Sequence, residues 1–330
     1  MLTQPSTPAD TPSQRPHPTA PAAMPTFIIV GATKAGTTSL YHYLKQHPDI
    51  YMSPVKETKF FTVEEGTIPR ENGPEGWRVG ASHVKTLEAY RALFEPAGDE
   101  HARGEASPQY LYYPEVPRRI HKHVPEAEII AVLRNPVDRA FSAFSHQLRD
   151  GKEVHTDFAA ALQDEPERIR DGWSPLYHYR AQGFYYEQLR RYYDTFDADK
   201  VHVYLYDDLR NDPVGISENI FAALGVDETF TPNFETQHNI SGVPKSKLLH
   251  RAHHFLRGSN RSLLKTLGKT LLPASARGRF KAKAMQTLQA NNLEKPPFSC
   301  ELRAELREAY REDIGKLQGL IGRDLSHWLQ

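Results

Sequence analysis

The sequence has little of what secreted and membrane-spanning proteins rely on. Its 330 residues include one cysteine, Cys300, which excludes an intramolecular disulfide and a cysteine-based zinc site. No apolar run approaches the ~20 residues of a membrane helix. Residues 1–25 are rich in Pro, Thr, Ser and Ala and lack the apolar core of a signal peptide. We therefore expect a cytoplasmic protein with a disordered tail over residues 1–25 and one domain over residues 26–330.

Net charge is also absent, because 41 Lys and Arg residues balance 41 Asp and Glu residues. The composition therefore favours no nucleic-acid partner. The balance is uneven along the chain, since residues 236–293 contain no acidic residue while Lys and Arg recur between Lys245 and Lys283. Such a segment attracts anions, although most of its side chains are expected to be solvated. The amphipathic stretch Leu263–Leu272 makes peripheral contact with an anionic membrane surface a candidate role.

The same segment contains the chain's one candidate set of histidine metal ligands. His250, His253 and His254 could share one face of a helix. No carboxylate lies near them in the sequence, so the ligand set is incomplete for most metals. We expect no metal site.

A glycine loop, Gly31–Leu40, directly follows the apolar run Phe27–Val30 and precedes an amphipathic helical pattern. A strand, a glycine loop and a helix in this order cradle an oxyanion, because the first N–H groups of the helix point at the ligand. The glycines match the G-x-x-x-x-G-K-[ST] pattern of nucleotide triphosphatases, but Thr37 stands at the lysine position and Lys34 lies inside the loop. The loop is therefore expected to bind a shorter anion than a γ-phosphate.

Apolar runs and helical patterns alternate along the rest of the chain. This alternation predicts an α/β fold of the P-loop-like, three-layer kind, with about five parallel strands and helices on both faces. The predicted strands are 27–30, 49–52, 103–106, 128–133 and 201–206, and the predicted helices include 84–94, 157–169, 184–196, 213–224 and 301–320.

Two of the predicted strands are followed within a few residues by charged side chains. The strand 128–133 is followed by Arg134 and a proline-initiated helix, on which Ser142 lies two turns along. An arginine fork beside a hydroxyl suits a phosphate group, although a surface arginine at a helix start explains the pattern equally well. Glu57 follows the second strand between two lysines, where an open α/β sheet places its chemistry; the alternative is a solvated loop.

Together these stretches resemble the sulfotransferases that use 3'-phosphoadenosine 5'-phosphosulfate. The Lys34 loop looks like their 5'-phosphosulfate motif, the Arg134 and Ser142 pair is similar to their 3'-phosphate motif, and Gly242–Lys247 resembles their late basic loop. The ending Gly322–Trp328 resembles bacterial members, so the similarity covers residues 26–330. The resemblance implies this donor, no required metal, and donor contacts from Lys34, Ala35, Gly36, Thr37, Thr38, Ser39, Arg134, Ser142, Gly242, Lys245 and Lys247.

The resemblance also suggests which residue acts as the base. Cytosolic phenol and steroid sulfotransferases have a catalytic histidine where this chain has Ser107, before a proline. Heparan-type enzymes instead use a glutamate shortly before a Phe-Phe pair, and Glu57 occupies that setting. The implied catalytic residues are Lys34 and Glu57, acting on a hydroxyl or amine of a carbohydrate, lipid or small-molecule acceptor. Ala106 follows Glu105 where heparan-type enzymes tend to have a lysine, so a heparan-like acceptor is not implied.

Two other functions remain open from the residues alone. A P-loop kinase or triphosphatase would use the acidic end of the run Val201–Asp208 as a magnesium ligand. A non-catalytic nucleotide-binding protein would keep the anion-binding loop Gly31–Leu40 but would not catalyse a transfer. The sequence predicts no oligomeric state, and it leaves the acceptor unnamed. Aromatic residues that could line an acceptor site are Trp77, Tyr110, Tyr112, Tyr113 and Trp173.

Overall fold

The computed structural model describes residues 24–63, 67, 72–74, 83–235, 243–244, 293–294 and 296–330. Almost all of the predicted tail and of the acid-free segment lies outside these residues. Disorder of the tail, membrane contact, the single domain and the cytoplasmic location therefore stay predictions. Within the described residues, no helix is both long and apolar enough to cross a membrane.

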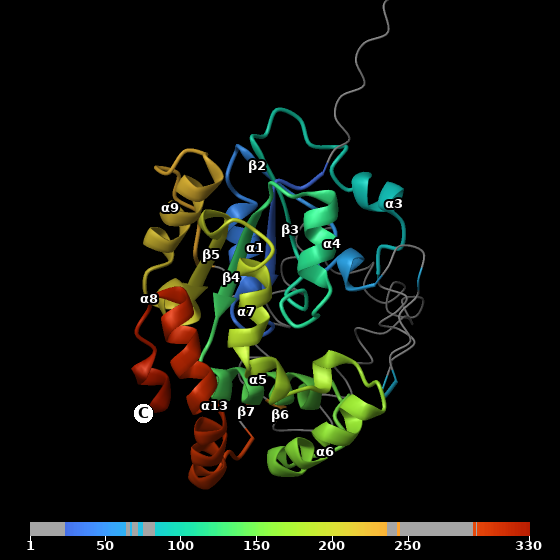
Figure 1. Ribbon diagram of the computed structural model, residues 1–330, viewed down its shortest axis with the longest axis vertical. Coiled ribbons are helices and arrows are strands. Elements are labelled where there is room, and N and C mark those ends of the chain that lie inside the picture. The colour runs from blue at the N-terminus through green and yellow to red at the C-terminus, as the bar shows by residue number, and fades with distance from the viewer. Residues whose placement is uncertain are drawn as a thin grey trace, which may run out of the picture.

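A five-stranded parallel sheet forms the centre of the molecule, in the order β2-β3-β1-β4-β5 (Figure 1). Neighbouring strands pair in parallel throughout this sheet. The prediction of a parallel α/β fold is confirmed. The strands are β1 Phe27–Gly31, β2 Ile50–Met52, β3 Ala102–Ala106, β4 Glu128–Leu133 and β5 Val201–Leu205, and a separate antiparallel pair joins β6 Val243–Pro244 to β7 Leu293–Glu294.

Helices cover both faces of the sheet. In Figure 1, α4 and α7 lie in front of the sheet, α1 lies behind it, and α13 runs beside α7. The α-helices are α1 Thr37–Leu44, α3 Leu87–Arg91, α4 Val116–His123, α5 Pro136–Arg149, α6 Phe158–Arg170, α7 Tyr185–Tyr193, α8 Tyr206–Asn211, α9 Pro213–Leu224 and α13 Cys300–Ile321. Short 3₁₀ turns are η1 Phe60–Thr62, η2 Pro175–Tyr177, η3 Ala181–Gly183, η4 Ala198–Lys200 and η6 Ser326–Leu329.

The hydrophobic pattern explains which faces are buried. All of β1 is buried, and so is β4 apart from its first residue, as expected for central strands that are covered on both sides. On α13 the residues in helical phase, Leu306, Tyr310, Ile314 and Leu317, are buried, which confirms the predicted packed terminal helix. The predicted helix 84–94 is shorter, because the Thr86 side chain accepts a hydrogen bond from Ala89 N at 3.2 Å and so sets its start at Leu87.

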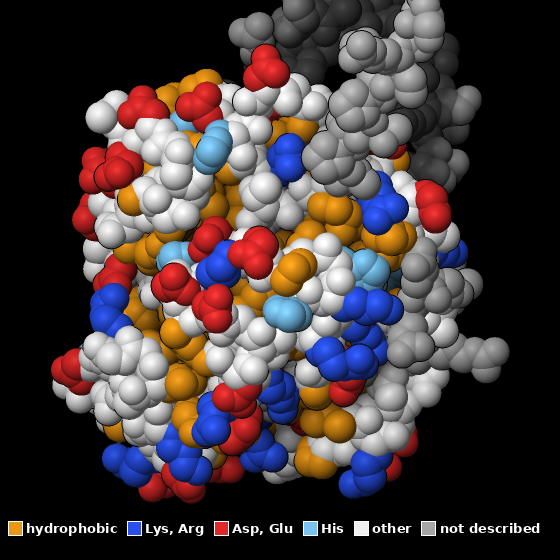
Figure 2. All heavy atoms as spheres, turned by 45° about the horizontal axis from the view of Figure 1, so that its top comes forward, with side chains coloured by type: hydrophobic (Ala, Val, Ile, Leu, Met, Phe, Trp, Pro, Cys, Tyr) orange, Lys and Arg blue, Asp and Glu red, His pale blue; other side chains and the backbone are white. Residues whose placement is uncertain are grey.

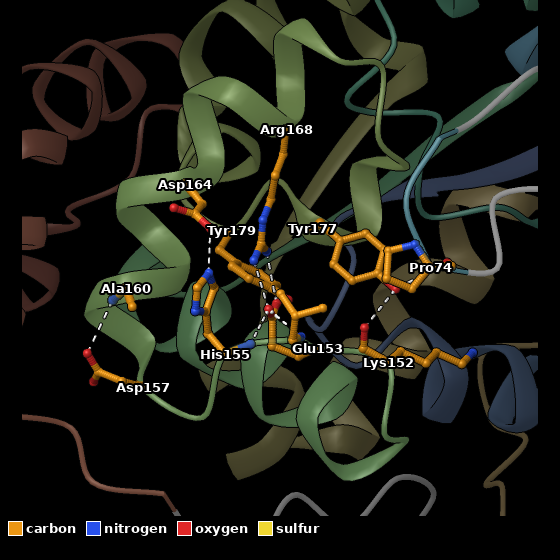
Figure 3. Close-up of polar contacts among 11 residues, drawn as sticks. Pro74, Lys152, Glu153, His155, Asp157, Ala160, Asp164, Arg168, Tyr177 and Tyr179 are labelled. Atoms are coloured by element: carbon orange, nitrogen blue, oxygen red, sulfur yellow. Dashed lines mark hydrogen bonds and ion pairs between the residues drawn. The ribbon is translucent and has the colours of Figure 1, made fainter.

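A buried ion pair joins α6 to the loop that precedes it (Figure 3). Arg168 on α6 donates two hydrogen bonds, of 2.9 and 2.8 Å, to the carboxylate of Glu153, and the Tyr179 hydroxyl donates a further bond to that carboxylate. The guanidinium lies 5.0 Å from the centre of the Trp173 ring. Burial raises the pKa of Glu153, but the bonds from Arg168 outweigh it and the pKa is lowered. We call these residues, Glu153, Arg168, Trp173 and Tyr179, the Arg168 cluster.

Candidate active site

The candidate site lies where the direction of chain winding reverses. Strands β1 and β4 are neighbours in the sheet, but α1 leads from β1 towards β2, and α5 begins the connection from β4 to β5 on the other side. Loops that leave such a strand pair in opposite directions open a crevice outside the carboxyl ends of the strands. The Lys34 loop and Arg134 border this crevice from its two sides.

The Lys34 loop reaches helix α1 through two residues in left-handed conformations. Lys34 has φ 67° and Gly36 has φ 90°, and Gly36 forms the N-cap of α1 without a side-chain hydrogen bond. The first N–H groups of α1 are therefore not satisfied by a capping side chain, which leaves them suited to an anion. Gly31 is required for packing, since a Cβ there would lie 2.6 Å from Leu111 Cβ.

One cavity of about 240 Å³ brings most of the predicted residues together. From the predicted set it is lined by Lys34, Gly36, Thr37, Thr38, Ser39, Glu57, Arg134 and Ser142. The sequence did not single out the remaining lining residues, which are Thr33, Pro108, Gln109, His146, Leu176 and Tyr206. The loops after β1, β2, β3 and β4 therefore all contribute to one site.

One predicted donor residue that the structure describes, Ala35, does not line this cavity. Ala35 is fully buried, and its N–H donates to the carbonyl of Ala32 at 3.2 Å. Gly242, Lys245 and Lys247 lie outside the described residues, as do the three histidines proposed as an alternative metal set.

Arg134 links the two halves of the crevice directly. Its Nη1 donates to the backbone carbonyl of Lys34 at 3.1 Å, and its guanidinium lies 4.9 Å from the centre of the Tyr206 ring. The Tyr185 hydroxyl donates to the carbonyl of Arg134 at 2.9 Å. The arginine is therefore oriented before any ligand binds.

Positive charge is concentrated at the floor of the cavity. Burial lowers the pKa of Lys34 to about 8, and the nearby charges of Arg149 and Arg134 contribute to the decrease. Burial and the charge of Lys34 lower the pKa of His146 to about 4, so this histidine is neutral at pH 7. His146 lies one turn beyond Ser142 on α5, and this i, i+4 spacing was the signal in the sequence that could have identified it.

Glu57 faces the cations from the loop after β2. Its N–H donates to the carbonyl of Ala106 at 2.9 Å, and its φ of 63° is unusual for a residue other than glycine. The side chain is 41% exposed and forms an ion pair of 2.7 Å with Lys56. Burial raises the pKa of the carboxyl, but the charge and hydrogen bond of Lys56, helped by Lys59, lower it overall. Glu57 is therefore ionised at neutral pH.

A second carboxyl group, that of Glu105 on β3, supports the Glu57 loop from below. Glu105 is fully buried and accepts hydrogen bonds from the hydroxyls of Thr58, Ser107 and Tyr90 at 2.7, 3.0 and 3.0 Å. Ser107 Oγ in turn accepts from the N–H of Lys59 at 3.2 Å. Burial raises the pKa of Glu105, and these hydrogen bonds offset only part of the increase. The two residues that follow Glu57, Thr58 and Lys59, are thus fixed to β3 and to Ser107 at its end.

Of the aromatic residues proposed to line an acceptor site, Trp77 lies outside the described residues, and the four described ones do not line the cavity. Tyr110 is fully buried and accepts from Phe61 N at 3.3 Å, so it belongs to the core and not to the cavity. The cavity wall is formed instead by its neighbours Pro108 and Gln109. Gln109 is 2% exposed, and neither polar atom of its amide has a hydrogen-bond partner in the part of the chain that the structure describes.

The geometry does not favour the kinase alternative. A magnesium ligand was expected at the end of β5, but Asp208 pairs with Arg323 at 2.7 Å and Asp207 pairs with Arg210 at 3.4 Å. Neither aspartate lines the cavity. The residue before them, Tyr206, lines it instead. Across the described ranges, no cluster of His, Cys, Asp and Glu side chains could hold a metal ion.

Known proteins are similar to this chain over most of its length. The profile of the Sulfotransferase family matches residues 25–232. A sulfotransferase from Alicyclobacillus acidocaldarius is 34% identical, with a TM-score of 0.72, and the alignment covers 93% of this chain and 100% of that one. These two matches confirm the predicted P-loop-like fold and the predicted enzyme class.

Curated relatives share less of their own length. The mouse bifunctional heparan sulfate N-deacetylase/N-sulfotransferase 4 is 27% identical over 319 residues, which are 93% of this chain but 31% of the relative. The human heparan sulfate glucosamine 3-O-sulfotransferase 6 is 27% identical over 207 residues, which are 63% of this chain and 54% of the relative. Both names confirm the predicted similarity to heparan-type enzymes. Since the family profile covers more than half of its residues, this chain belongs to the sulfotransferase family.

Proposed function

We propose that this protein transfers a sulfuryl group from 3'-phosphoadenosine 5'-phosphosulfate to a hydroxyl or amine of an acceptor. The observation that carries the proposal is the single cavity that holds Lys34, Arg134 and Glu57 together. It combines an anion cradle, a second cation and an ionised carboxylate. A sulfuryl transferase needs these three parts to hold its donor and activate its acceptor.

The donor's two phosphate groups would occupy the two sides of the crevice. Lys34 and the first N–H groups of α1 would hold the 5'-phosphate, with the Thr37 and Thr38 hydroxyls beside it. Arg134 and Ser142 would hold the 3'-phosphate, and the proposal adds Lys245 and Lys247 from outside the described residues. The 3'-phosphate contact would discriminate against ATP, which lacks this group.

Transfer would proceed by in-line displacement at sulfur. The acceptor oxygen or nitrogen forms a bond to sulfur while the bond from sulfur to the 5'-phosphate oxygen breaks, and the electron pair stays on that oxygen. Lys34 and the helix N–H groups stabilise the charge that develops there. A sulfuryl group bears less negative charge than a phosphoryl group, so we assign no step to a metal ion.

Glu57 would accept the proton that the acceptor loses. Its carboxyl is ionised in the free protein, because Lys56 and Lys59 lower its pKa. A base works best when its pKa approaches the working pH. A bound donor brings negative charge next to Lys34 and Glu57, which raises the pKa of the carboxyl towards that range. We therefore propose that Glu57 becomes an effective base once the donor is bound.

The proposal is tested by titrating 3'-phosphoadenosine 5'-phosphate into the protein in a calorimeter, with and without magnesium. We expect magnesium-independent binding that Lys34→Ala and Arg134→Ala each weaken about 10- to 100-fold, the size of a lost charge-assisted hydrogen bond. Arg190→Ala is the matched control, because Arg190 is an exposed arginine of α7 paired with Asp194 at 3.2 Å. Absence of binding, or binding of ATP only with magnesium, would contradict the proposal and favour a nucleotide kinase.

A further inference from the structure

The C-terminal helix α13 holds the start of helix α7 in place. The two helices run side by side (Figure 1), and the carboxylate of Asp313 on α13 accepts hydrogen bonds from the backbone N–H groups of Tyr185 and Tyr186 at 2.8 and 3.2 Å. The first N–H groups of a helix have no partner within it, and the N-cap residue of α7, Phe184, forms no side-chain hydrogen bond. Asp313 therefore caps α7 from a neighbouring helix.

The charge of Asp313 also suits this position. Burial raises its pKa to about 6, with a smaller contribution from Glu187, while the N–H groups of Tyr185 and Tyr186 and the charge of Lys316 act in the opposite direction. The carboxyl is therefore ionised at pH 7. A negative charge at the N-terminus of a helix is favourable, because the backbone dipoles leave that end positive.

The tyrosine that Asp313 holds reaches the candidate donor site. Tyr185 is fully buried, and its hydroxyl donates to the backbone carbonyl of Arg134 at 2.9 Å. Arg134 lines the active-site cavity, and its guanidinium donates to the carbonyl of Lys34 at 3.1 Å. The main chain of this arginine is thus bonded to α7 and its side chain to the loop after β1. Hydrogen bonds lead without interruption from α13 to the cavity.

A second contact from the C-terminal end of the chain supports the same turn. Asn135 follows Arg134, and its side-chain oxygen caps α5. Its Nδ2 donates to the carbonyl of Trp328 at 3.4 Å. The Trp328 ring is buried, with its centre 6.3 Å from that of Tyr185. The turn between β4 and α5 is therefore held from α13 and from η6, which both lie near the end of the chain.

We propose that Asp313 is a positioning residue for the donor, because it holds Tyr185 against the carbonyl of Arg134 and so orients this arginine towards the 3'-phosphate. The inference rests on the proposed function, in which Arg134 binds that phosphate. It adds a residue that does not line the cavity. Without this support Arg134 would have more orientations to lose on binding, which lowers the affinity. The loss should be confined to ligands that carry a 3'-phosphate.

The test uses the full-length protein and variants that each change one link. Tyr185→Phe removes only the hydroxyl that reaches Arg134, and Asp313→Ala removes the cap of α7. Asp313→Asn is the conservative variant, because asparagine is also a strong capping residue and its oxygen can accept from the same N–H groups. Tyr185→Phe keeps the cap, so it decides the question even if Asp313→Ala does not fold.

Each link has a matched control. Tyr192→Phe removes a hydroxyl from the same helix, where Tyr192 donates to the carbonyl of Tyr110 at 3.0 Å. Asp157→Ala removes the cap of α6, where Asp157 accepts from Ala160 N at 3.2 Å (Figure 3). Neither control residue is among the described residues that line the cavity. Acidic and basic side chains both occur across the face shown in Figure 2, so the loss of one carboxylate should by itself change the field at the cavity little.

The measured quantities are the calorimetric affinities for 3'-phosphoadenosine 5'-phosphate and for adenosine 5'-monophosphate, which lacks the 3'-phosphate. We expect Tyr185→Phe and Asp313→Ala to bind the bisphosphate about 3- to 10-fold more weakly than the wild type, as fits the ordering of one long side chain. Asp313→Asn and both controls should stay within about twofold, and so should every affinity for the monophosphate. In an Arg134→Ala background neither substitution should weaken binding further, because the guanidinium is already absent.

Three results would overturn the inference. These are unchanged bisphosphate affinity in Tyr185→Phe or in folded Asp313→Ala, equal losses for the bisphosphate and the monophosphate, or the same losses in the Arg134→Ala background. Losses of equal size in the two controls would overturn it as well. A wild-type protein that does not bind the bisphosphate would contradict the proposed function itself, whereas any of the other results with normal wild-type binding would contradict this inference alone.

Discussion

The floor of the active-site cavity and the Arg168 cluster both hold buried charge, but they compensate it differently. In the Arg168 cluster both terminal nitrogens of the guanidinium donate to the Glu153 carboxylate, and although burial lowers the pKa of Arg168, these bonds raise it overall. In the cavity, burial and two neighbouring arginines lower the pKa of Lys34 to about 8. Buried charges that are neutralised by an opposite charge of the protein hold the fold together. Buried cations without such a partner are suited to bind an anion from solution. The difference separates a structural site from a functional one.

The largest effect is expected from Glu57→Gln. Turnover should fall by ~10²- to 10⁴-fold, because the amide cannot accept the acceptor's proton. The affinity for 3'-phosphoadenosine 5'-phosphate should change little. Glu126→Gln is the control, since Glu126 also pairs with a lysine at 2.7 Å, here Lys200, but lies outside the cavity. A Glu57→Gln enzyme with wild-type turnover would assign the base elsewhere.

The next largest effect is expected from Arg168→Met, and it concerns stability. The change leaves the Glu153 carboxylate buried without its partner, so the free energy of unfolding in urea should fall by ~3–5 kcal/mol. The double variant Glu153→Gln/Arg168→Met removes both charges and should recover most of the loss. Nucleotide affinity measured on the folded protein should stay unchanged in both. Equal instability of the single and the double variant would contradict the view of a closed, compensated pair.

Glu105→Gln should affect both stability and turnover, because Glu105 is a buried residue that supports the loop carrying Glu57. The amide offers only one acceptor oxygen to the hydroxyls of Thr58, Ser107 and Tyr90, so the unfolding free energy should fall by ~1–3 kcal/mol. Turnover should fall as well, because this network positions the Glu57 loop. The informative comparison is kcat against KM for the donor. A stable variant with unchanged kcat would restrict Glu105 to a structural role.

The smallest effect on stability is expected from Lys34→Met, which should stabilise the protein while weakening donor binding about 10- to 100-fold. The native state disfavours the charged lysine, because its pKa lies at about 8 against 10.5 for a free lysine. This penalty is complete below pH 8 and disappears as the pH rises from 8 through 10.5, since the unfolded chain then binds the extra proton. The gain at pH 7 should be ~1 kcal/mol, reduced from the full shift by contact with solvent.

Urea unfolding curves at pH 7 and pH 10 test the Lys34 prediction. The difference in unfolding free energy between Lys34→Met and the wild type should shrink at the higher pH. A variant that is less stable than the wild type at pH 7 would mean that the lysine is already compensated within the protein.

Much of the fold could be predicted from the sequence, because the central strands β1 and β4 are almost continuous apolar runs and several helices have clear apolar stripes. Residues 128–133 form β4 as predicted, and 213–224 form α9. Helix 84–94 was predicted too long, because periodicity extends past the point where the Thr86 cap sets the start.

The candidate site was predictable in part, because the loops after parallel strands all lie at one edge of the sheet. Residues directly after strands, such as Lys34 and Arg134, meet at one edge of the sheet, so their sequence position indicates their place. His146 reaches the same cavity through its i, i+4 position after Ser142 on α5, a signal that the sequence analysis did not use. Gln109 reaches it through the path of a loop, which has no signature in the sequence. The tyrosines after β3 were proposed for the acceptor, but Tyr110 is in the core, because composition alone cannot tell a wall from a packed interior.

The hydrogen bond from Arg134 to the carbonyl of Lys34 has a consequence for molecular recognition. It joins the loop after β1 to the end of β4, so the spacing between the two anion-binding positions is set by the protein and not by the ligand. A nucleotide with phosphates at that spacing loses little conformational freedom on binding, whereas one with a different spacing would have to break the bond. The crevice thus selects ligands by the distance between their two negative groups.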